Sequence, residues 1–257
     1  MLIKTSRFKG VAYFEKKPKL LSIFSLIEHV QCSRIKKVIG FKKKSKYTKI
    51  IKLSFNSPDE ILNSFRKNTR YDIRKAESYN INFTICEDII LFIKFYNEFA
   101  IQKNMNEIDE NLFSKYYILG SNLFITYVKE GENIIVMHSY IIDQKINRVR
   151  LLHSASSNKY LEGDSKKNYL LGVANKYLHY MDILYFKNQG FIKYDFGGYA
   201  YLTTDKILKG INNFKDQFKG ELIEESNFTP YFKIILIKIK HIIMYILNPN
   251  IYNKHEI

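Results

Sequence analysis

Several residue types are scarce in this chain of 257 residues, and each scarcity excludes a class of protein. Tryptophan is absent, and there are only 11 Gly and 4 Pro. These numbers exclude collagen-like and low-complexity chains, and they predict long regular elements joined by short loops. The two cysteines, Cys32 and Cys86, are too few and too far apart for a disulfide framework or a zinc motif. A reducing compartment fits this usage best, so we expect a cytoplasmic protein.

The sequence also lacks an apolar run of the roughly 20 residues that a membrane-spanning helix needs. Leu20–Ile27 is a short apolar run behind a basic stretch. Glu28 and His29 follow it at the place where a signal peptide would carry small residues. We therefore expect this run to form a buried helix or strand.

Acidic residues are in the minority, because 25 Asp and Glu face 41 Lys and Arg, for a formal net charge of +16. Such a balance favours anionic partners: nucleic acid, phosphorylated substrates or an acidic membrane surface. Part of the excess reflects the abundance of Ile, Lys, Asn and Tyr, which AT-rich codons encode. The charge alone is thus a weak indication of nucleic-acid binding, and we expect no DNA partner.

The residues that are abundant predict a folded α/β chain, with 46% hydrophobic and 15% aromatic residues. Lys42–Lys49 predicts a solvated basic loop before a strand at Lys49–Phe55, and Ser57 caps a helix that runs to about Ser78. Hydrophobic periodicity predicts the remaining elements. They are strand Ile81–Ile85, helices Asp88–Gln102 and Asp109–Leu119, strands Asn122–Val128, Ile134–Ile142 and Arg148–Ser154, a long helix from Asp164 to Gly190, strand Phe191–Phe196, helix Asp205–Phe214 and strand Glu221–Glu225.

The first of three motifs is the basic helix Lys67–Glu77. Arg70 and Arg74 are four residues apart and lie on one helical face, with Lys67 one turn before them. Such a stripe can hold a phosphate or diphosphate, since arginine offers two parallel hydrogen bonds to an anion. The alternative is a solvated basic face whose charges pair with acids of the same helix.

The second motif, Tyr194–Gly198, places an acid and two glycines at the end of a strand. Glycine lets the backbone approach a ligand closely, and ligands gather at the carboxyl ends of strands in open α/β sheets. Asp195 would then face a ligand; the alternative is an ordinary turn capped by this acid. The third motif, Gly210–Gly220, aligns Phe214 with Phe218 and Lys215 with Lys219, which simple amphipathicity also explains.

Together the three motifs resemble the Fem family of peptidoglycan aminoacyltransferases and the related GNAT-like acetyltransferases associated with surface polysaccharides. The resemblance covers roughly residues 57–225. It implies an α/β (α+β) fold with a GNAT-like mixed, largely antiparallel sheet flanked by helices on both faces. The expected parts are a reduced N-terminal GNAT-like portion at 1–56, the acyltransferase core at 57–228 and a basic amphipathic tail at 229–257.

The resemblance also implies an activity. A Fem-type enzyme transfers an acyl or aminoacyl group from acyl-CoA or aminoacyl-tRNA to an amino group of a cell-envelope precursor. The acceptor would be an amino sugar, a nucleotide sugar or a peptidoglycan peptide, phosphorylated or lipid-linked. The family's pattern assigns Lys215 to the reaction site. Candidate substrate-binding residues are Arg70, Tyr71, Arg74, Lys75, Gly197, Gly198 and Lys219.

Amide formation requires a base that takes the amine's proton and a group that stabilises the oxyanion. Asp195 is the first candidate for the base and His153 the second; the alternative for His153, which the residue pattern favours, is a satisfied core or edge histidine. Lys215 would stabilise the oxyanion or hold a phosphate. The chain departs from the family in having room for one GNAT-like domain and in lacking an Arg/Gln-x-x-Gly-x-Gly/Ala loop between Ser154 and Lys167, which weakens CoA as the donor.

Searches for other chemistry find no nucleophile elbow, zinc-protease helix, P-loop or dinucleotide fingerprint, and the scattered histidines predict no metal site. Tyr231–Leu247 is apolar with four interspersed basic residues, which predicts either a helix at the inner face of the membrane or a terminal element docked on the core. The rival to the enzyme is a non-catalytic basic module that binds tRNA or a membrane on a decayed acyltransferase scaffold. The enzyme predicts that Asp195 and Lys215 face one cleft with the basic helix Lys67–Lys75 at its rim, whereas the rival predicts a basic surface without a cleft.

Overall fold

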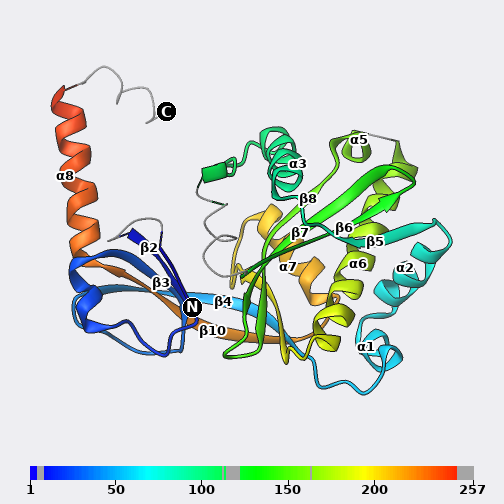
Figure 1. The fold of residues 1–257 in the computed structure, drawn as a ribbon, viewed down its shortest axis with the longest axis horizontal. Helices are drawn as coiled ribbons and strands as arrows, with labels where there is room; N and C mark the ends of the chain where they lie inside the picture. The colour runs from blue at the N-terminus through cyan, green and yellow to red at the C-terminus, as the bar shows by residue number, and fades with distance from the viewer. Residues whose placement is uncertain (5–8, 112, 114–121, 163, 248–257) are drawn as a thin grey trace. The chain divides into compact units, whose positions relative to one another are not determined.

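The structure is a computed structural model that describes residues 1–4, 9–111, 113, 122–162 and 164–247. The chain divides into two compact units, each drawn in Figure 1. The core unit is Tyr47–Ile223, and the terminal unit combines Met1–Lys46 with Glu224–Ile257. The sequence expectation instead separated the N-terminal portion from the C-terminal tail, because periodicity along the chain carries no information about which distant segments pair.

The core unit is built on a mixed sheet in which antiparallel pairs predominate. Its strands lie in the order β4, β9, β8, β7, β6, β5. Their bounds are Phe41–Lys52, Lys193–Tyr199, Arg148–Ser156, Asn133–Asp143, Leu123–Glu130 and Ile81–Ile85. Each neighbouring pair is antiparallel except β8 and β9, which are parallel. The predicted antiparallel meander of β6, β7 and β8 is confirmed.

Helices cover both faces of this sheet, as Figure 1 shows. Along β7, Met137 packs with α3 (Ile89–Gln102), whereas Val136 and Tyr140 pack toward α6 (Ser165–Asn188). This alternation follows from the twofold period of a strand. The other helices of the core unit are α1 (Pro58–Ser64), α2 (Lys67–Glu77), α5 (Asn158–Leu161) and α7 (Lys206–Asp216). The predicted helix Asp109–Leu119 lies partly outside the described residues.

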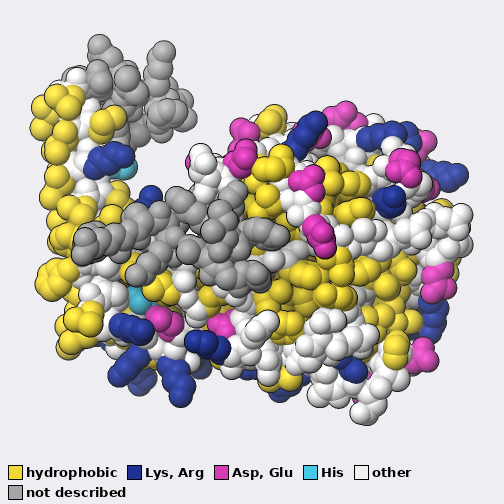
Figure 2. All heavy atoms as spheres, viewed as in Figure 1, with side chains coloured by type: hydrophobic (Ala, Val, Ile, Leu, Met, Phe, Trp, Pro, Cys, Tyr) yellow, Lys and Arg dark blue, Asp and Glu magenta, His cyan; other side chains and the backbone are white. Residues whose placement is uncertain are grey.

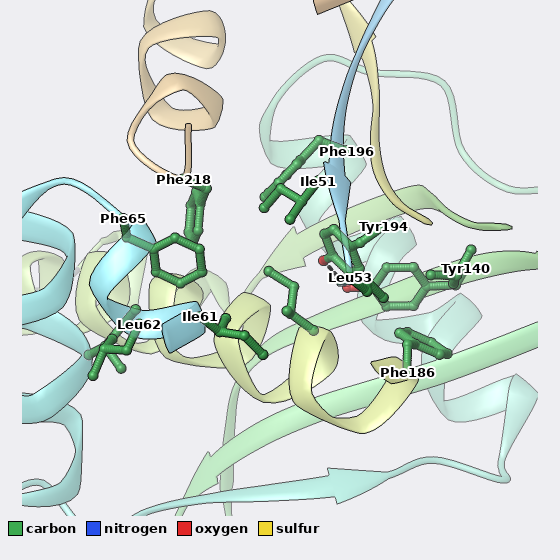
Figure 3. Close-up of a cluster of buried hydrophobic side chains, with 13 residues drawn as sticks. Ile51, Leu53, Ile61, Leu62, Phe65, Tyr140, Phe186, Tyr194, Phe196 and Phe218 are labelled. Atoms are coloured by element: carbon green, nitrogen blue, oxygen red, sulfur yellow. Dashed lines mark hydrogen bonds between the residues drawn. The ribbon is translucent and has the colours of Figure 1, made fainter. Parts of the chain in front are cut away.

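Aromatic rings fill the main core between α1, α6 and the sheet, as Figure 3 shows. Phe65 lies edge-on to Phe218 with ring centroids 5.1 Å apart, and Phe186 lies edge-on to Tyr140 at 5.0 Å. Each such fully buried side chain contributes about 1.5–3 kcal/mol by its removal from water. The core therefore anchors the ends of α1 and α7 to the central strands.

The predicted helix from Ser57 to about Ser78 is two helices, α1 and α2. Its start is confirmed, because the Ser57 hydroxyl accepts from the backbone N–H of Glu60 at 3.2 Å. Phe65 then adopts an extended backbone with ψ of 166° and is fully buried. The next N–H, of Arg66, donates to the carbonyl of Gln217 rather than to a helical partner. Burial of Phe65 and this long-range bond break the helix, and local periodicity could not reveal either.

The terminal unit contains strands in the order β1, β2, β3, β10, with a short 3₁₀ helix and α8. The bounds of the four strands, in that order, are Leu2–Lys4, Lys9–Tyr13, Leu26–Cys32 and Glu221–Pro230. The 3₁₀ helix is Leu20–Phe24, and α8 is Tyr231–Leu247. Two predictions fail. The run Leu20–Ile27 is not buried throughout, since Leu21 is 95% exposed. The basic segment Lys42–Lys49 is not a loop but part of β4, where the sheet satisfies the backbone while most of the lysines face solvent.

Candidate active site

The site is created where two parallel strands of the core unit part. Strands β8 and β9 are paired over Arg148–Arg150 and Lys193–Asp195. Beyond that point β8 continues beside β7, and β9 continues beside β4. The two strands therefore separate beyond Arg150 and Asp195.

A cavity of about 560 Å³ occupies this opening, a volume typical of small-molecule sites. Its wall includes Leu151, His153 and Ser154 from β8 and Phe196–Gly198 from β9. Phe99 of α3 closes one side, whereas α6 and α7 close the other. We call this the β8–β9 cavity; its lining is mainly apolar with a few convergent polar groups.

Lys215 is the basic side chain that α7 presents to this cavity. It is 9% exposed, and its Nζ donates to the carbonyl oxygen of Gly198 at 2.5 Å. Burial lowers its pKa to about 8, with Arg150 adding repulsion and Asp195 partly opposing the shift. At neutral pH Lys215 is a poorly solvated cation beside the parted strands, which suits it to bind a developing negative charge.

Arg150 is a second cation in the cavity wall, and the sequence analysis did not identify it. No residue in the described ranges forms a hydrogen bond with its guanidinium, and its Nε is buried without a partner. A buried donor of this kind is costly unless a ligand satisfies it. The signal was present in the sequence as two charges, Arg148 and Arg150, on one face of an otherwise apolar strand.

Asp195 lies beneath the cavity rather than in its wall. Its carboxylate is fully buried and accepts from Arg148 Nη2 at 2.5 Å, from the N–H of Gly197 at 2.8 Å and from the Thr48 hydroxyl. Burial alone would raise its pKa, but Arg148 and Arg150 outweigh burial and lower it. The geometry makes Asp195 an anchor of the Gly197–Gly198 turn, and its role as the base stays a prediction that this geometry does not favour.

Gly197 and Gly198 line the β8–β9 cavity, and their role in substrate binding stays a prediction. Gly197 has a φ of +73°, and a side chain there would place a Cβ 3.0 Å from the carbonyl oxygen of Leu151. Only glycine allows this close approach of β9 to β8. The other lysine of the third motif, Lys219, is exposed and is not part of the cavity wall.

His153 lines the cavity from β8 and packs between rings of the α3 face. Its Nδ1 lies 3.0 Å from the Ser139 hydroxyl, and its ring is 4.8 Å from that of Tyr96. Burial, with a contribution from Arg150, lowers its pKa to about 4. His153 is therefore neutral at pH 7 and held by its neighbours, which is consistent with both interpretations of this residue.

A second histidine of the cavity wall, His179 on α6, was not predicted. It belongs to a fully buried polar network with Tyr194, Tyr140, Asp182 and His138. Potential ligand atoms of His138, His179 and Asp182 lie within 4.8 Å of one another. Their Nδ1 and Oδ2 atoms already bind each other or the tyrosine hydroxyls, so hydrogen bonds account for the cluster. The His-x-x-Asp spacing inside an apolar helix was the available signal.

The basic helix α2 lies away from the β8–β9 cavity. Lys67, Tyr71 and Asp72 line a separate open hollow of about 760 Å³, together with Lys176 of α6 and residues of α7. We call this the α2 hollow. Lys176 Nζ binds the Asp72 carboxylate at 2.6 Å. The structure therefore does not bring this part of the first motif together with Lys215 in one cavity.

The other predicted residues of α2, namely Arg70, Arg74 and Lys75, are not part of the lining of the hollow. Arg70 Nη1 donates to the carbonyl of Phe65 at 2.7 Å, which caps the end of α1. Arg74 is exposed. Lys75 Nζ lies 4.7 Å from the ring centroid of Tyr169 and 5.7 Å from that of Tyr71. Such cation–π contacts hold Lys75 in place without neutralising its charge.

The strand order and helices define a GNAT-like α/β fold, and comparison with solved structures confirms it. FemX matches with a TM-score of 0.58 and 16% identity over 78% of this chain and 68% of its own. L-PGS from Bacillus licheniformis matches with a TM-score of 0.58 and 12% identity, over 89% of this chain and 79% of its own. The C-terminal domain of a putative lysylphosphatidylglycerol synthetase from Agrobacterium fabrum matches with a TM-score of 0.58 and 9% identity, over 93% of this chain and 82% of its own.

At these identities the likeness establishes the fold, and the resemblance to the Fem type is confirmed at that level. No protein-family model and no curated protein matches the sequence. Across the described residues, no helix is both long and apolar enough to cross a membrane.

Proposed function

We propose that this chain is an N-acyltransferase that moves an acyl or aminoacyl group from acyl-CoA or aminoacyl-tRNA to an amino group of a cell-envelope precursor. The observation that carries the proposal is the β8–β9 cavity with Lys215 and Arg150 in its wall. The names of the structural neighbours, FemX and a putative lysylphosphatidylglycerol synthetase, support a transferase in general and leave the amino acceptor as part of the proposal.

The chemistry needs few protein groups. The amine nitrogen attacks the carbonyl carbon of an ester or thioester, the carbon–oxygen or carbon–sulfur bond breaks, and an amide forms. The amine loses one proton, and the leaving alkoxide or thiolate gains one. Lys215 and Arg150 supply donors for the oxyanion that develops in between, in a site where burial strengthens such bonds.

The cavity argues against the rival function. A non-catalytic basic module was expected to present a basic surface without a cleft, whereas here Lys215 and Arg150 line a mainly apolar cavity. Lys215 is 9% exposed, whereas a module for tRNA or membrane binding would rely on exposed cations. The enzyme is therefore the function that we favour.

A thermal-shift titration with acetyl-CoA, longer acyl-CoAs and aminoacyl-tRNA tests the proposal. A ligand that binds only the folded state raises the melting temperature with its concentration. We expect a saturable rise with one donor class, and a similar rise in Lys215→Met, because this lysine is assigned to the oxyanion rather than to the bound donor. Uncharged tRNA and free CoA are the controls. No shift with any donor would contradict the enzyme and favour the binding module.

We also propose that α8 holds the protein at an anionic membrane surface, where lipid-linked acceptors lie. None of its residues is buried, and Figure 2 shows hydrophobic side chains along this helix. Helical spacing puts Ile235, Ile239 and Ile242 on one apolar face, which Lys238 borders. Lys233 and Lys240 lie on the opposite face, where Lys233 Nζ also binds the Glu28 carboxylate at 2.8 Å. Such a helix lies in the interface with its apolar face in the lipid.

Vesicle sedimentation with matched variants tests this orientation. Ile239→Glu charges the apolar face and should abolish binding to vesicles that contain phosphatidylglycerol. Ile237→Glu places the same charge between the basic residues and should weaken binding less. Equal effects of the two variants, or binding that survives deletion of residues 231–257, would contradict the membrane role.

A further inference from the structure

A chain of buried hydrogen bonds leads from the core to the β8–β9 cavity. The Tyr140 hydroxyl donates to Asp182 Oδ2 at 2.5 Å. The hydroxyls of Tyr140 and Tyr194 lie 2.7 Å apart, and Figure 3 shows these two side chains meeting in the core. Tyr194 in turn lies 2.7 Å from Nδ1 of His179. His179 is 1% exposed and its side chain lines the cavity.

The hydrogen bond from Tyr140 to Asp182 determines the direction of every other hydrogen bond in this chain. A phenol has one proton, and that of Tyr140 is committed to Asp182. Tyr194 must therefore donate to Tyr140, and its oxygen is left to accept from His179. Burial, reinforced by the charge of Asp182, raises the pKa of both tyrosines well above its ordinary value, so both hydroxyls keep their protons. His179 consequently carries its proton on Nδ1.

The other ring nitrogen of His179, Nε2, is then an unprotonated acceptor. In the described part of the chain, no residue forms a hydrogen bond with it. Burial lowers the pKa of His179 well below its ordinary value, and His138 and Lys215 add to the effect. The titratable groups around the ring are thus His138 from β7, Tyr194 from β9, Asp182 from its own helix and Lys215 from α7.

We propose that His179, held in the Nδ1–H tautomer by Tyr194, Tyr140 and Asp182, is the base that takes the amine proton during acyl transfer. This inference rests on the proposed function. The nitrogen becomes strongly acidic once it has attacked the carbonyl, so a weakly basic neutral imidazole suffices to accept its proton at Nε2. Nδ1–H keeps donating to Tyr194, and the chain ending at the Asp182 carboxylate stabilises the imidazolium formed.

This arrangement distinguishes His179 from His153, the other histidine of the cavity wall. The Nδ1 of His153 binds the Ser139 hydroxyl, and Arg150 is the charged group that lowers its pKa. Among the described residues, Ser139 does not link His153 to a carboxylate by a hydrogen bond. No carboxylate would thus stabilise a protonated His153, whereas the hydrogen-bond chain connects a protonated His179 to the Asp182 carboxylate.

Kinetics with whichever donor the wild type turns over test the proposal. His179→Gln should lower kcat by about 10²- to 10⁴-fold with donor affinity nearly unchanged. Tyr194→Phe should give a smaller loss, while Tyr160→Phe, which also removes one hydroxyl from a buried tyrosine, should keep wild-type kcat. Imidazole added to His179→Ala should restore part of the rate, an effect that a merely structural residue would not show.

A nitrogen-15 spectrum of the histidine side chains tests the tautomer without any substrate. We expect His179 in the Nδ1–H form, and a mixture of tautomers in Tyr194→Phe. An Nε2–H signal for His179, or His179→Gln with wild-type kcat while His153→Gln is inactive, would overturn the assignment and leave the acyltransferase intact. A wild type that turns over no donor would overturn the proposed function, and the role of His179 with it.

Discussion

The β8–β9 cavity and the α2 hollow both collect basic side chains, yet they hold charge differently. In the cavity, Lys215 is 9% exposed and its pKa falls to about 8 because water is excluded. In the hollow, Lys67 is exposed and Lys176 is paired with Asp72. The comparison teaches that sequence charge alone does not identify a reactive cation. Burial separates a group suited to chemistry from groups suited to retaining an anion.

Among substitutions that test the difference between the two regions, the largest expected effect is on stability. Asp195→Asn removes the charge that pairs with buried Arg148 and should lower the free energy of unfolding by about 3–5 kcal/mol. Asp72→Asn makes the same change in the α2 hollow, where Lys176 keeps access to water, and should cost less. Urea denaturation of both variants measures the difference. Equal losses would contradict the distinction between the two regions.

The pH dependence of this stabilisation follows from the lowered pKa of Asp195. The unfolded chain binds the proton more readily than the folded one, so the stabilisation is complete above the ordinary pKa of 3.8 and is lost as pH falls further. Wild-type protein should therefore lose more stability than Asp195→Asn when the pH is lowered from about 5 to 3. A parallel decline of the two proteins would contradict the ion pair's contribution.

The next effect is on catalysis in the cavity. Lys215→Met removes a preorganised donor and should lower kcat by about 10²- to 10³-fold, the usual cost of losing one oxyanion contact. Lys209→Met alters an exposed lysine of the same helix and should leave kcat unchanged. Single-turnover measurements with bound donor separate chemistry from binding. A rate in Lys215→Met within a few-fold of the wild-type rate would place the reaction elsewhere.

A smaller effect on activity is expected when the pH is raised and the Lys215 side chain loses its proton. If its cationic form binds the oxyanion, activity should fall about tenfold per pH unit above pH 8, where the lysine loses its proton. Lys215→Arg stays charged and should not show this fall. The acceptor amine also titrates in this range, but it affects both enzymes equally, so its contribution cancels in the ratio of the two activities. A constant ratio from pH 7 to 10 would show that the charge of Lys215 is not used.

The sequence predicted the parts of the core unit that local pattern controls. Alternation identified β6, β7 and β8, and helical spacing identified α6, because each buries one face against its neighbours. Lys215 was named through the Fem resemblance. What the pattern could not predict depends on distant pairing: the break at Phe65, held by Gln217, and the anchoring of Asp195 by Arg148 across the sheet.

The candidate site shows the same division. Gly197 and Gly198 could be singled out because a strand end followed by two glycines is a local signal; they line the cavity, and their contact with a ligand stays a prediction. Arg150 and His179 were missed, because a charge in an apolar strand or helix has meaning only once its surroundings are known. The α2 residues were assigned to the same site as Lys215 since a one-dimensional motif gives no distance between helices.

The smallest effect expected is on acceptor binding at the α2 hollow. Lys67→Ala and Arg74→Ala each remove an exposed charge, whose interactions contribute no more than about 1 kcal/mol. We therefore expect KM for a phosphorylated acceptor to rise about two- to fivefold, with kcat and melting temperature unchanged and the difference fading at high salt. Lys94→Ala, on α3 at the other face of the sheet, is the control. A change in kcat rather than KM would mean that α2 takes part in the chemistry, and the separation between retaining an anion and reacting with the donor would no longer hold.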